Sequence, residues 1–230
     1  MASGSSGNGY LLESDNSCLI IEAGVKLKEV KKALNYNMSK ICGCILTHEH
    51  KDHCGYIREY LQNGIRCYMS GGTAEAINID SPYVKKITPK CVFTVGAYKV
   101  LPFRTKHDCS EPVGYLINHT ECGNILFATD TYYLPNTFKN LNHILIECNY
   151  AAELLEEDLP KNRKKRLLTS HLSLNTCIDA LRANDLSKAR NIMLIHLSNA
   201  HSNAVQFKKA VEAETGIPVL IAEKGVIMEV

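Results

Sequence analysis

The sequence predicts a single α/β domain in which strands and helices pack in layers around one core. The composition is that of an ordinary globular domain, since 45% of the 230 residues are hydrophobic and 22% are charged. Short apolar segments separated by glycine, asparagine and proline fill residues 92–128, a pattern typical of β-strands. After residue 143 helical and strand patterns alternate, which favours a layered α/β architecture. No repeat marks a boundary, so residues 1–230 are expected to form one domain.

The N-terminal third begins with a glycine- and serine-rich segment, residues 3–9, whose composition resembles a linker. Because this segment runs directly into an apolar stretch, we expect a tight glycine turn instead. Strands are predicted at residues 10–14 and 17–22, and a helix at 26–34 with apolar residues at helical spacing. An apolar strand follows at residues 41–46.

The remaining elements follow from the same periodicities. Helices are expected at residues 56–62, 73–77, from about 173, and 203–214, and strands at 66–69, within 92–103, at 113–118, 125–128, 143–147, 167–171 and 191–197, with a final strand pair. In the helix that starts near residue 173, Leu174, Ile178 and Leu181 share one face and are predicted to be buried.

Charge and cysteine content restrict the possible partners. The 26 basic and 24 acidic residues leave a net charge of +2, too small to indicate a nucleic-acid partner by itself. Ten cysteines in a chain of this length are too sparse for a disulfide scaffold. The sequence shows no secretory leader and no apolar run of about 20 residues, so we expect a cytoplasmic protein without a membrane partner. Nothing in the sequence indicates the oligomeric state.

The chemistry concentrates in the segment Thr47-His48-Glu49-His50-Lys51-Asp52-His53, directly after a predicted strand. Three imidazoles and a carboxylate that crowd together have one common explanation, a bound metal. Alternate residues of an extended segment face the same side, so His48 and His50 can reach one ion. The turn onto Asp52 and His53 can direct those two side chains to a second ion.

Two ions need further ligands, and the chain offers three more residues at or near predicted strand ends: His107, Asp130 and His196. A pair of divalent ions about 3.5–4 Å apart can share a water molecule and lower its pKa towards neutrality. Such a centre hydrolyses phosphoryl or carbonyl esters. Asp130 is expected to hold the ions together and Asp52 to orient the hydroxide, while a protonated His171 stabilises charge on the substrate.

The order of these motifs resembles the metallo-β-lactamase superfamily: the His48–His53 cluster, a downstream histidine, an aspartate in Ala128-Thr129-Asp130 and a late histidine. Further segments resemble its YycJ-like branch, which contains bacterial double-strand-specific exonucleases: Ser3-Gly4-Ser5-Ser6-Gly7-Asn8, His107-Asp108, Glu111-Pro112-Val113-Gly114, Ser170-His171-Leu172-Ser173 and His196-Leu197-Ser198. The resemblance covers the whole chain.

The resemblance implies a four-layer αββα sandwich with two metal sites at one edge. It assigns His48, His50 and His107 to the first site, Asp52, His53 and His196 to the second, and Asp130 as the bridge between them. Relatives commonly carry an aspartate before Ala-Gly at the end of the second strand, whereas this chain has Glu22. A hydrogen bond from this longer side chain to a ligand histidine would require a shifted backbone.

The predicted function is a hydrolase with two divalent ions, zinc or manganese, that cleaves DNA phosphodiesters through a metal-bridging hydroxide, with an exonuclease as the expected type. Asp52, Asp130 and His171 are its expected catalytic residues. The alternatives are a hydrolase of small lactones, thiolesters or cyclic phosphodiesters, and a non-catalytic binding module.

Three features keep two interpretations each. His171 faces the substrate or caps the helix that begins near Ser173. The basic run at residues 161–166 contacts nucleic-acid phosphates or is a solvated face. Cys42, Cys44 and Cys54 are buried thiols or ligands of a structural zinc, although no Cys-x-x-Cys pair occurs.

Overall fold

The computed structural model describes residues 2–156 and 158–229, and these divide into two compact units. Residues up to 104, together with 109–115 and 223–226, form the first unit. Residues 105–108, 116–222 and those from 227 form the second. The strands belong to two mixed sheets flanked by helices, which confirms the predicted α/β class.

The first unit is built on a five-stranded sheet with the order β1-β2-β3-β4-β5. Its strands are β1 (Tyr10–Glu13), β2 (Cys18–Ile21), β3 (Ile41–Ile45), β4 (Cys67–Ser70) and β5 (Val84–Ile87). β1 and β2 form an antiparallel hairpin, and the other neighbours are parallel. All four residues of β2 are buried, as expected for a strand inside a mixed sheet.

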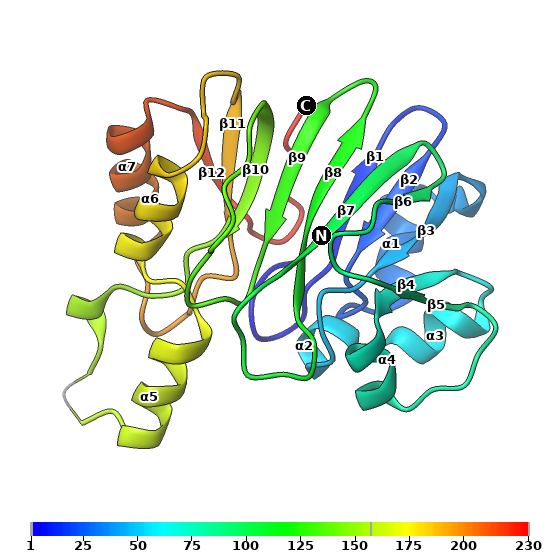
Figure 1. The fold of residues 1–230 in the computed structure, drawn as a ribbon, viewed down its shortest axis with the longest axis horizontal. Helices are drawn as coiled ribbons and strands as arrows, with labels where there is room; N and C mark the ends of the chain where they lie inside the picture. The colour runs from blue at the N-terminus through cyan, green and yellow to red at the C-terminus, as the bar shows by residue number, and fades with distance from the viewer. Residues whose placement is uncertain (1, 157, 230) are drawn as a thin grey trace. The chain divides into compact units, whose positions relative to one another are not determined.

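Helices cover this sheet within the first unit: α1 (Leu27–Ala33), the 3₁₀ turn η1 (Met38–Lys40), α2 (Lys51–Cys54), α3 (Ile57–Gln62) and α4 (Gly71–Ile77). α3 contacts β4, and α4 contacts β4 and β5, as Figure 1 shows. α1 buries Leu27 and Val30, two of the apolar residues that predicted it. The unit also contains an antiparallel pair, β6 (Phe93–Val95) and β7 (Tyr98–Arg104), and the start of β8 (Val113–His119).

The second unit contains four parallel strands in the order β12-β11-β10-β9. They are β9 (Gly123–Ala128), β10 (Leu141–Glu147), β11 (Asn191–Ile195) and β12 (Val219–Ile221). Its helical elements are η2 (Ala152–Leu154), α5 (Lys161–Ser170), α6 (Leu174–Arg182) and α7 (Ala204–Thr215). α6 and α7 contact each other, and α7 packs on β12 (Figure 1).

Local sequence explains the ends of the last two helices. Ser173 caps α6 by accepting a hydrogen bond from the Thr176 amide, and the predicted apolar face of α6 is buried. Asn203 caps α7 in the same way. α7 ends at Gly216, whose φ of 69° is the left-handed conformation that glycine adopts without strain.

Two expectations about secondary structure are wrong. The predicted strand at residues 167–171 is the last part of α5, followed by His171. Lysine, arginine and leucine favour helix, and Pro160 is compatible with a helix start, so the two leucines at 167–168 extend a helix and do not begin a strand. The expected final strand pair is a single strand, β12, within the described residues.

The sequence analysis did not predict one of the strands, β5. In β5 (Val84–Ile87) only the two end residues are apolar, and the two lysines between them are exposed. β5 lies at the edge of the first sheet, where lysine is a common protection against pairing with other chains. Two apolar residues separated by two lysines do not show the alternation by which a strand is recognised in a sequence.

Candidate functional site

In the first unit, the histidine-rich segment leads from the end of β3 into a short helix. His48 follows the strand, His50 is the N-cap of α2, and Asp52 and His53 lie in α2. The Nε2 atom of His48 is 3.1 Å from the Nδ1 atom of His50. Two imidazole nitrogens bound to one tetrahedral zinc at about 2.0–2.1 Å would be separated by roughly 3.3 Å. The spacing of this pair therefore fits one shared cation.

Hydrogen bonds determine which nitrogen of His48 carries its proton. The hydroxyl of Thr47 donates to Glu22 Oε1 at 2.6 Å and lies 2.9 Å from His48 Nδ1. Because the single hydroxyl proton goes to the carboxylate, His48 Nδ1 must be the donor to Thr47. The Nε2 lone pair of His48 is therefore directed at His50, where either an imidazole proton or a cation satisfies it.

Glu22 also faces the second half of the segment. Its Oε1 atom lies 3.4 Å from His53 Nδ1, and both side chains are buried. Glu22 follows β2 with a φ of 72°, a left-handed conformation that is uncommon for a residue with a Cβ. From that backbone the longer carboxylate accepts a hydrogen bond from Thr47 and also lies near His53 Nδ1, without the geometry of a hydrogen bond to it.

Asn8 contacts proposed site residues, whereas the sequence analysis placed it in a glycine turn and in a segment that resembles the YycJ-like branch, without a role of its own. It is fully buried, and its side-chain amide lies 3.2 Å from Asp52 Oδ2 and 3.1 Å from His53 Nε2. Its backbone amide donates to the Asp52 carbonyl at 2.7 Å. The glycine-rich segment folds around Asn8, since Gly4 exchanges two hydrogen bonds with its side chain. The expected glycine turn is therefore present and contacts α2.

In the second unit, the ends of three neighbouring parallel strands deliver polar groups to one place. Asp130 follows β9, Glu147 ends β10, and His196 follows β11. Together with His171 they form a group whose potential ligand atoms all lie within 4.8 Å of one another. Carboxyl ends of parallel strands are the usual position of sites in α/β proteins.

The distances in this cluster are short. His171 Nδ1 lies 2.6 Å from Glu147 Oε1 and 3.2 Å from Asp130 Oδ1. His196 Nδ1 lies 3.3 Å from the same Glu147 oxygen and 3.6 Å from Asp130 Oδ1. Two carboxylates and two imidazoles thus converge in a buried volume, which is the donor set of a divalent-cation site.

Glu147 was missed by the sequence analysis, which treated it as the end of an apolar strand. It is fully buried, and its Oε2 atom accepts hydrogen bonds from the amides of Thr131 at 3.1 Å and Leu172 at 3.2 Å. Burial opposes its ionisation, but the neighbouring His171 holds the pKa of Glu147 below its ordinary value. The available signal was an acid as the last residue of a predicted apolar strand, comparable to the aspartate near a strand end that indicated Asp130.

His171 lies between α5 and α6 and belongs to the cluster. The capping interpretation is wrong, because Ser173 is the N-cap of α6. Burial lowers the pKa of His171, but Glu147 and Asp130 outweigh it and raise the pKa to about 10. A cation bound at Asp130 would oppose that protonation.

His107 is part of the second unit as well. Its Nδ1 atom donates to the Ser170 carbonyl at 2.9 Å, and its ring centroid lies 5.4 Å from that of His171. Burial lowers the pKa of His107, so its neutral form, the form that binds metals, is favoured. The next residue, Asp108, forms an ion pair with Arg166 of α5 at 2.8 Å.

The cysteines do not form an alternative metal site. The ten thiols form no disulfide, and none of the metal-competent groups among the described residues contains a cysteine. Cys42 and Cys44 lie in β3, as expected. Burial raises the pKa of Cys54 to about 12, so its thiolate, the form that zinc binds, is disfavoured.

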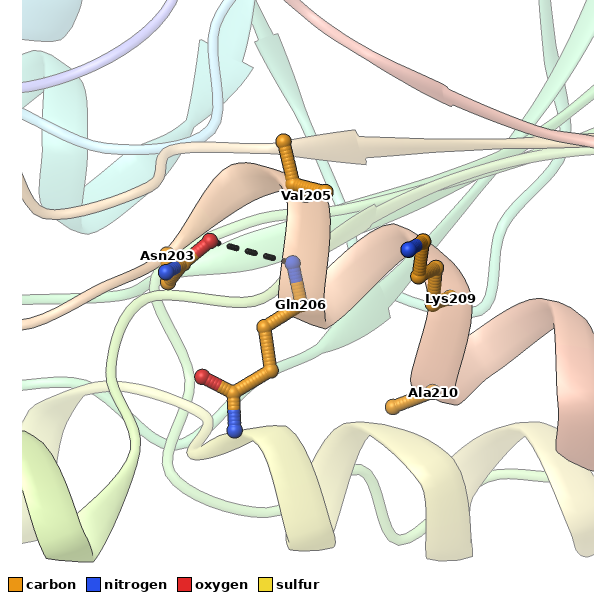
Figure 2. Close-up of a pocket in the computed structure, with 5 residues that line it drawn as sticks. All are labelled: Asn203, Val205, Gln206, Lys209 and Ala210. Atoms are coloured by element: carbon orange, nitrogen blue, oxygen red, sulfur yellow. Dashed lines mark hydrogen bonds between the residues drawn. The ribbon is translucent and has the colours of Figure 1, made fainter.

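The hollow drawn in Figure 2 offers little chemistry. It lies along α7 and is lined by Asn203, Val205, Gln206, Lys209 and Ala210. The lining has one amine and no histidine, carboxylate or thiol. The candidate catalytic residues are therefore those of the His/Asp clusters, whose imidazole and carboxylate donors are consistent with a binuclear metal site.

Among the described helices, none combines the length and the hydropathy needed to span a bilayer.

Comparison with known proteins gives relatives over most of the chain. Residues 19–197 match the family described as "Beta-lactamase superfamily domain". The chain is 29% identical over 224 residues to the exodeoxyribonuclease WalJ of Streptococcus pneumoniae, covering 88% of this chain and 81% of that protein. It is 27% identical over 217 residues to the exodeoxyribonuclease YycJ of Bacillus anthracis, covering 86% and 81%.

Solved structures support the same fold. The metallo-β-lactamase fold protein YhfI of Bacillus subtilis matches with a TM-score of 0.72 at 18% identity, covering 99% of this chain and 96% of that one. The short form of human tRNase Z matches with a TM-score of 0.64 at 14% identity, covering 99% and 96%. The resemblance in the motifs is thus confirmed: the chain belongs to the metallo-β-lactamase superfamily and carries the His/Asp clusters of a metallohydrolase.

Proposed function

We propose that this protein is a nuclease that uses two divalent ions to hydrolyse phosphodiester bonds in DNA. The observation that carries the proposal is the combination of His/Asp clusters at strand ends with similarity to two proteins named as exodeoxyribonucleases over 86–88% of the chain. Imidazole and carboxylate donors bind divalent ions, and such ions would meet the two requirements of phosphodiester hydrolysis, neutralisation of the phosphate charge and activation of a water molecule.

The proposed ligands come from both units. One ion would be held by His48, His50 and His107, the other by Asp52, His53 and His196, with Asp130 shared between them. Each unit supports its own share of this assignment. In the first unit, a nitrogen of His48 lies 3.1 Å from a nitrogen of His50. In the second unit, Asp130 and His196 converge with Glu147 and His171. The assignment of both ligand sets to one pair of ions rests on the family resemblance. Bound ions would supply positive charge for the phosphate and an activated water.

The residues around the proposed ligands orient them. Thr47, which donates to Glu22, fixes the tautomer of His48, and Asn8 holds Asp52, whose carboxylate would orient the attacking water. In the second unit, Glu147 accepts the Nδ1 proton of His171 at 2.6 Å. When the His171 ring carries a proton on both nitrogens, its Nε2–H is the group that would donate a hydrogen bond to the substrate, which is the role proposed for this residue.

The test is hydrolysis by the purified chain with Mn²⁺ or Zn²⁺, using linear duplex DNA and a chromogenic phosphodiester side by side. We expect degradation of the DNA, loss of activity on chelation, and about two ions per chain by metal analysis. Asp130→Asn should abolish activity, whereas Asp80→Asn, at an exposed position, is the control. Hydrolysis of the small ester alone would contradict the nuclease and favour the small-molecule alternative. Unchanged DNA cleavage by the Asp130 variant would remove the proposed site.

A further inference from the structure

α5 is an unusual helix because it is charged and scarcely packed. Five of its first six residues are basic and none of its residues is acidic. Leu167 is half-buried, Ser170 alone is fully buried, and every other residue of the helix is exposed, including Leu168 at 44%. The neighbouring α6, in contrast, buries five of its nine residues. Most helices of globular proteins gain stability from an apolar face, which α5 lacks.

The charges of α5 oppose its own helical structure. Lys161 lies three and four residues from Lys164 and Lys165, and like charges at these spacings cost roughly 0.2–0.5 kcal/mol per pair. Arg163 and Arg166 form a further pair of this kind. The first turn also places cations at the positive end of the helix dipole. An element that contradicts local preferences in this way is expected to have a function outside the fold.

The C-terminal end of α5 is fixed to the candidate site. Arg166 Nε donates to Asp108 Oδ2 at 2.8 Å, next to His107. The carbonyl of Ser170 accepts a hydrogen bond from His107, and the residue after the helix is His171. The helix therefore starts in solvent and ends at two residues of the proposed site.

The other cations of α5 point to an external anion. Arg166 is paired, but no ion pair within the described part of the chain involves Lys161, Arg163, Lys164 or Lys165. Acidic residues precede the helix at 153, 156, 157 and 158, and those at 153, 156 and 158 are exposed. Exposed basic side chains with no acidic partner are the typical means of contacting phosphates along a nucleic-acid backbone.

We propose that α5 is a docking surface for the phosphate backbone of duplex DNA, which it guides towards His107 and His171. That the bound polyanion is DNA rests on the proposed function. That the contact lies on α5 rests on the charge and the exposure of this helix. The basic residues neutralise phosphates and release counterions, so they contribute affinity without sequence preference. An acidic protein segment is the competing partner, and the experiment below separates it from DNA.

The experiment measures binding of the full chain, with its metal, to a fluorescent phosphorothioate duplex that resists hydrolysis. Lys164→Gln/Lys165→Gln is compared with Lys208→Gln/Lys209→Gln, which alters two adjacent exposed lysines of α7. Each lost phosphate contact should lower the slope of log K against log salt concentration by about 0.9. We expect the slope of the α5 variant to fall by about 2 and that of the α7 variant to stay at the wild-type value. Thermal melting by circular dichroism verifies that both variants fold.

Each outcome separates the docking surface from the nuclease activity. An unchanged slope in the α5 variant, or an equal fall in both variants, would overturn the docking surface while leaving DNA cleavage by the wild type intact. An α5-dependent slope in a protein that cannot cut DNA would support the surface and contradict the proposed function. Displacement of DNA by poly-glutamate at lower charge concentration than by unlabelled DNA would overturn the proposal in favour of an acidic protein partner.

Discussion

Replacement of Glu147 should show how far one buried carboxylate holds the second unit together. Its two oxygens accept hydrogen bonds from the buried amides of Thr131 and Leu172 and contact both His171 and His196. Glu147→Ala removes all of these acceptors at once.

The magnitude follows from the groups left without an acceptor. A buried amide that loses its partner costs about 1–3 kcal/mol, and breaking a buried ion pair costs about 3–5 kcal/mol. These costs overlap, so we expect Glu147→Ala to lower the free energy of unfolding by about 4 kcal/mol, a large part of the about 5–15 kcal/mol typical of a domain. Glu147→Gln keeps the shape and one oxygen, and should cost about half as much.

The assay is urea unfolding of the metal-free chain, followed by far-UV circular dichroism because the sequence has no tryptophan. Glu121→Ala, at an exposed position, is the matched control and should stay within about 0.5 kcal/mol of wild type. If Glu147→Ala unfolds within about 1 kcal/mol of wild type, the carboxylate does not have the structural role argued from its contacts.

Three further predictions concern the first unit. Asn8→Ala should weaken metal binding about 10- to 100-fold, because the amide that orients two proposed ligands is lost; metal titration by calorimetry measures it, and wild-type affinity would contradict it. Gly24→Ala should destabilise the chain by more than about 1–3 kcal/mol, since a Cβ there would lie 1.7 Å from the Asp52 carbonyl, whereas Gly71→Ala meets nothing nearer than 3.7 Å and is the control in the same unfolding assay. Burial raises the pKa of Cys18 from 9.0 to about 12, so the unfolded thiol ionises first, and the free energy of unfolding should fall as pH rises from about 9 to 12. Iodoacetamide at pH 8, read by mass spectrometry, should leave Cys18 unmodified; rapid labelling would refute this.

The elements that the sequence predicted correctly are those with a complete local signal. α6 has three apolar residues at helical spacing and a serine cap, and β2 is a run of apolar residues before a turn. The histidine-rich segment was found because metal ligands close in sequence need no tertiary information. α5 was not predicted as a helix, and its second half was assigned to a strand, because its two leucines form too short a run to separate strand from helix by periodicity.

Glu147 and Asn8 needed the fold itself. Glu147 becomes a site residue only because β10 lies between β9 and β11 in parallel register, which brings its side chain between Asp130 and His196. Asn8 becomes one because the N-terminal turn packs against α2, more than 40 residues away in sequence. The local signals, an acid at the end of an apolar strand and an asparagine in a glycine-rich turn, do not show which other side chains these residues meet.

Backbone strain at the strand ends argues that these clusters serve a function. Glu22, Asp130 and His196 each follow a strand and have φ values of 72°, 46° and 55°, a conformation that residues with a Cβ rarely adopt. Such residues cost about 1–3 kcal/mol each and persist where the surrounding structure determines them. In the second unit the carboxylates of Asp130 and Glu147 share one cluster with His171, whose protonated ring offsets their charge in the absence of a cation. A fold that accepts this backbone cost at three strand ends is organised to present side chains to a site, and a cation that binds the folded chain and not the unfolded chain would stabilise it.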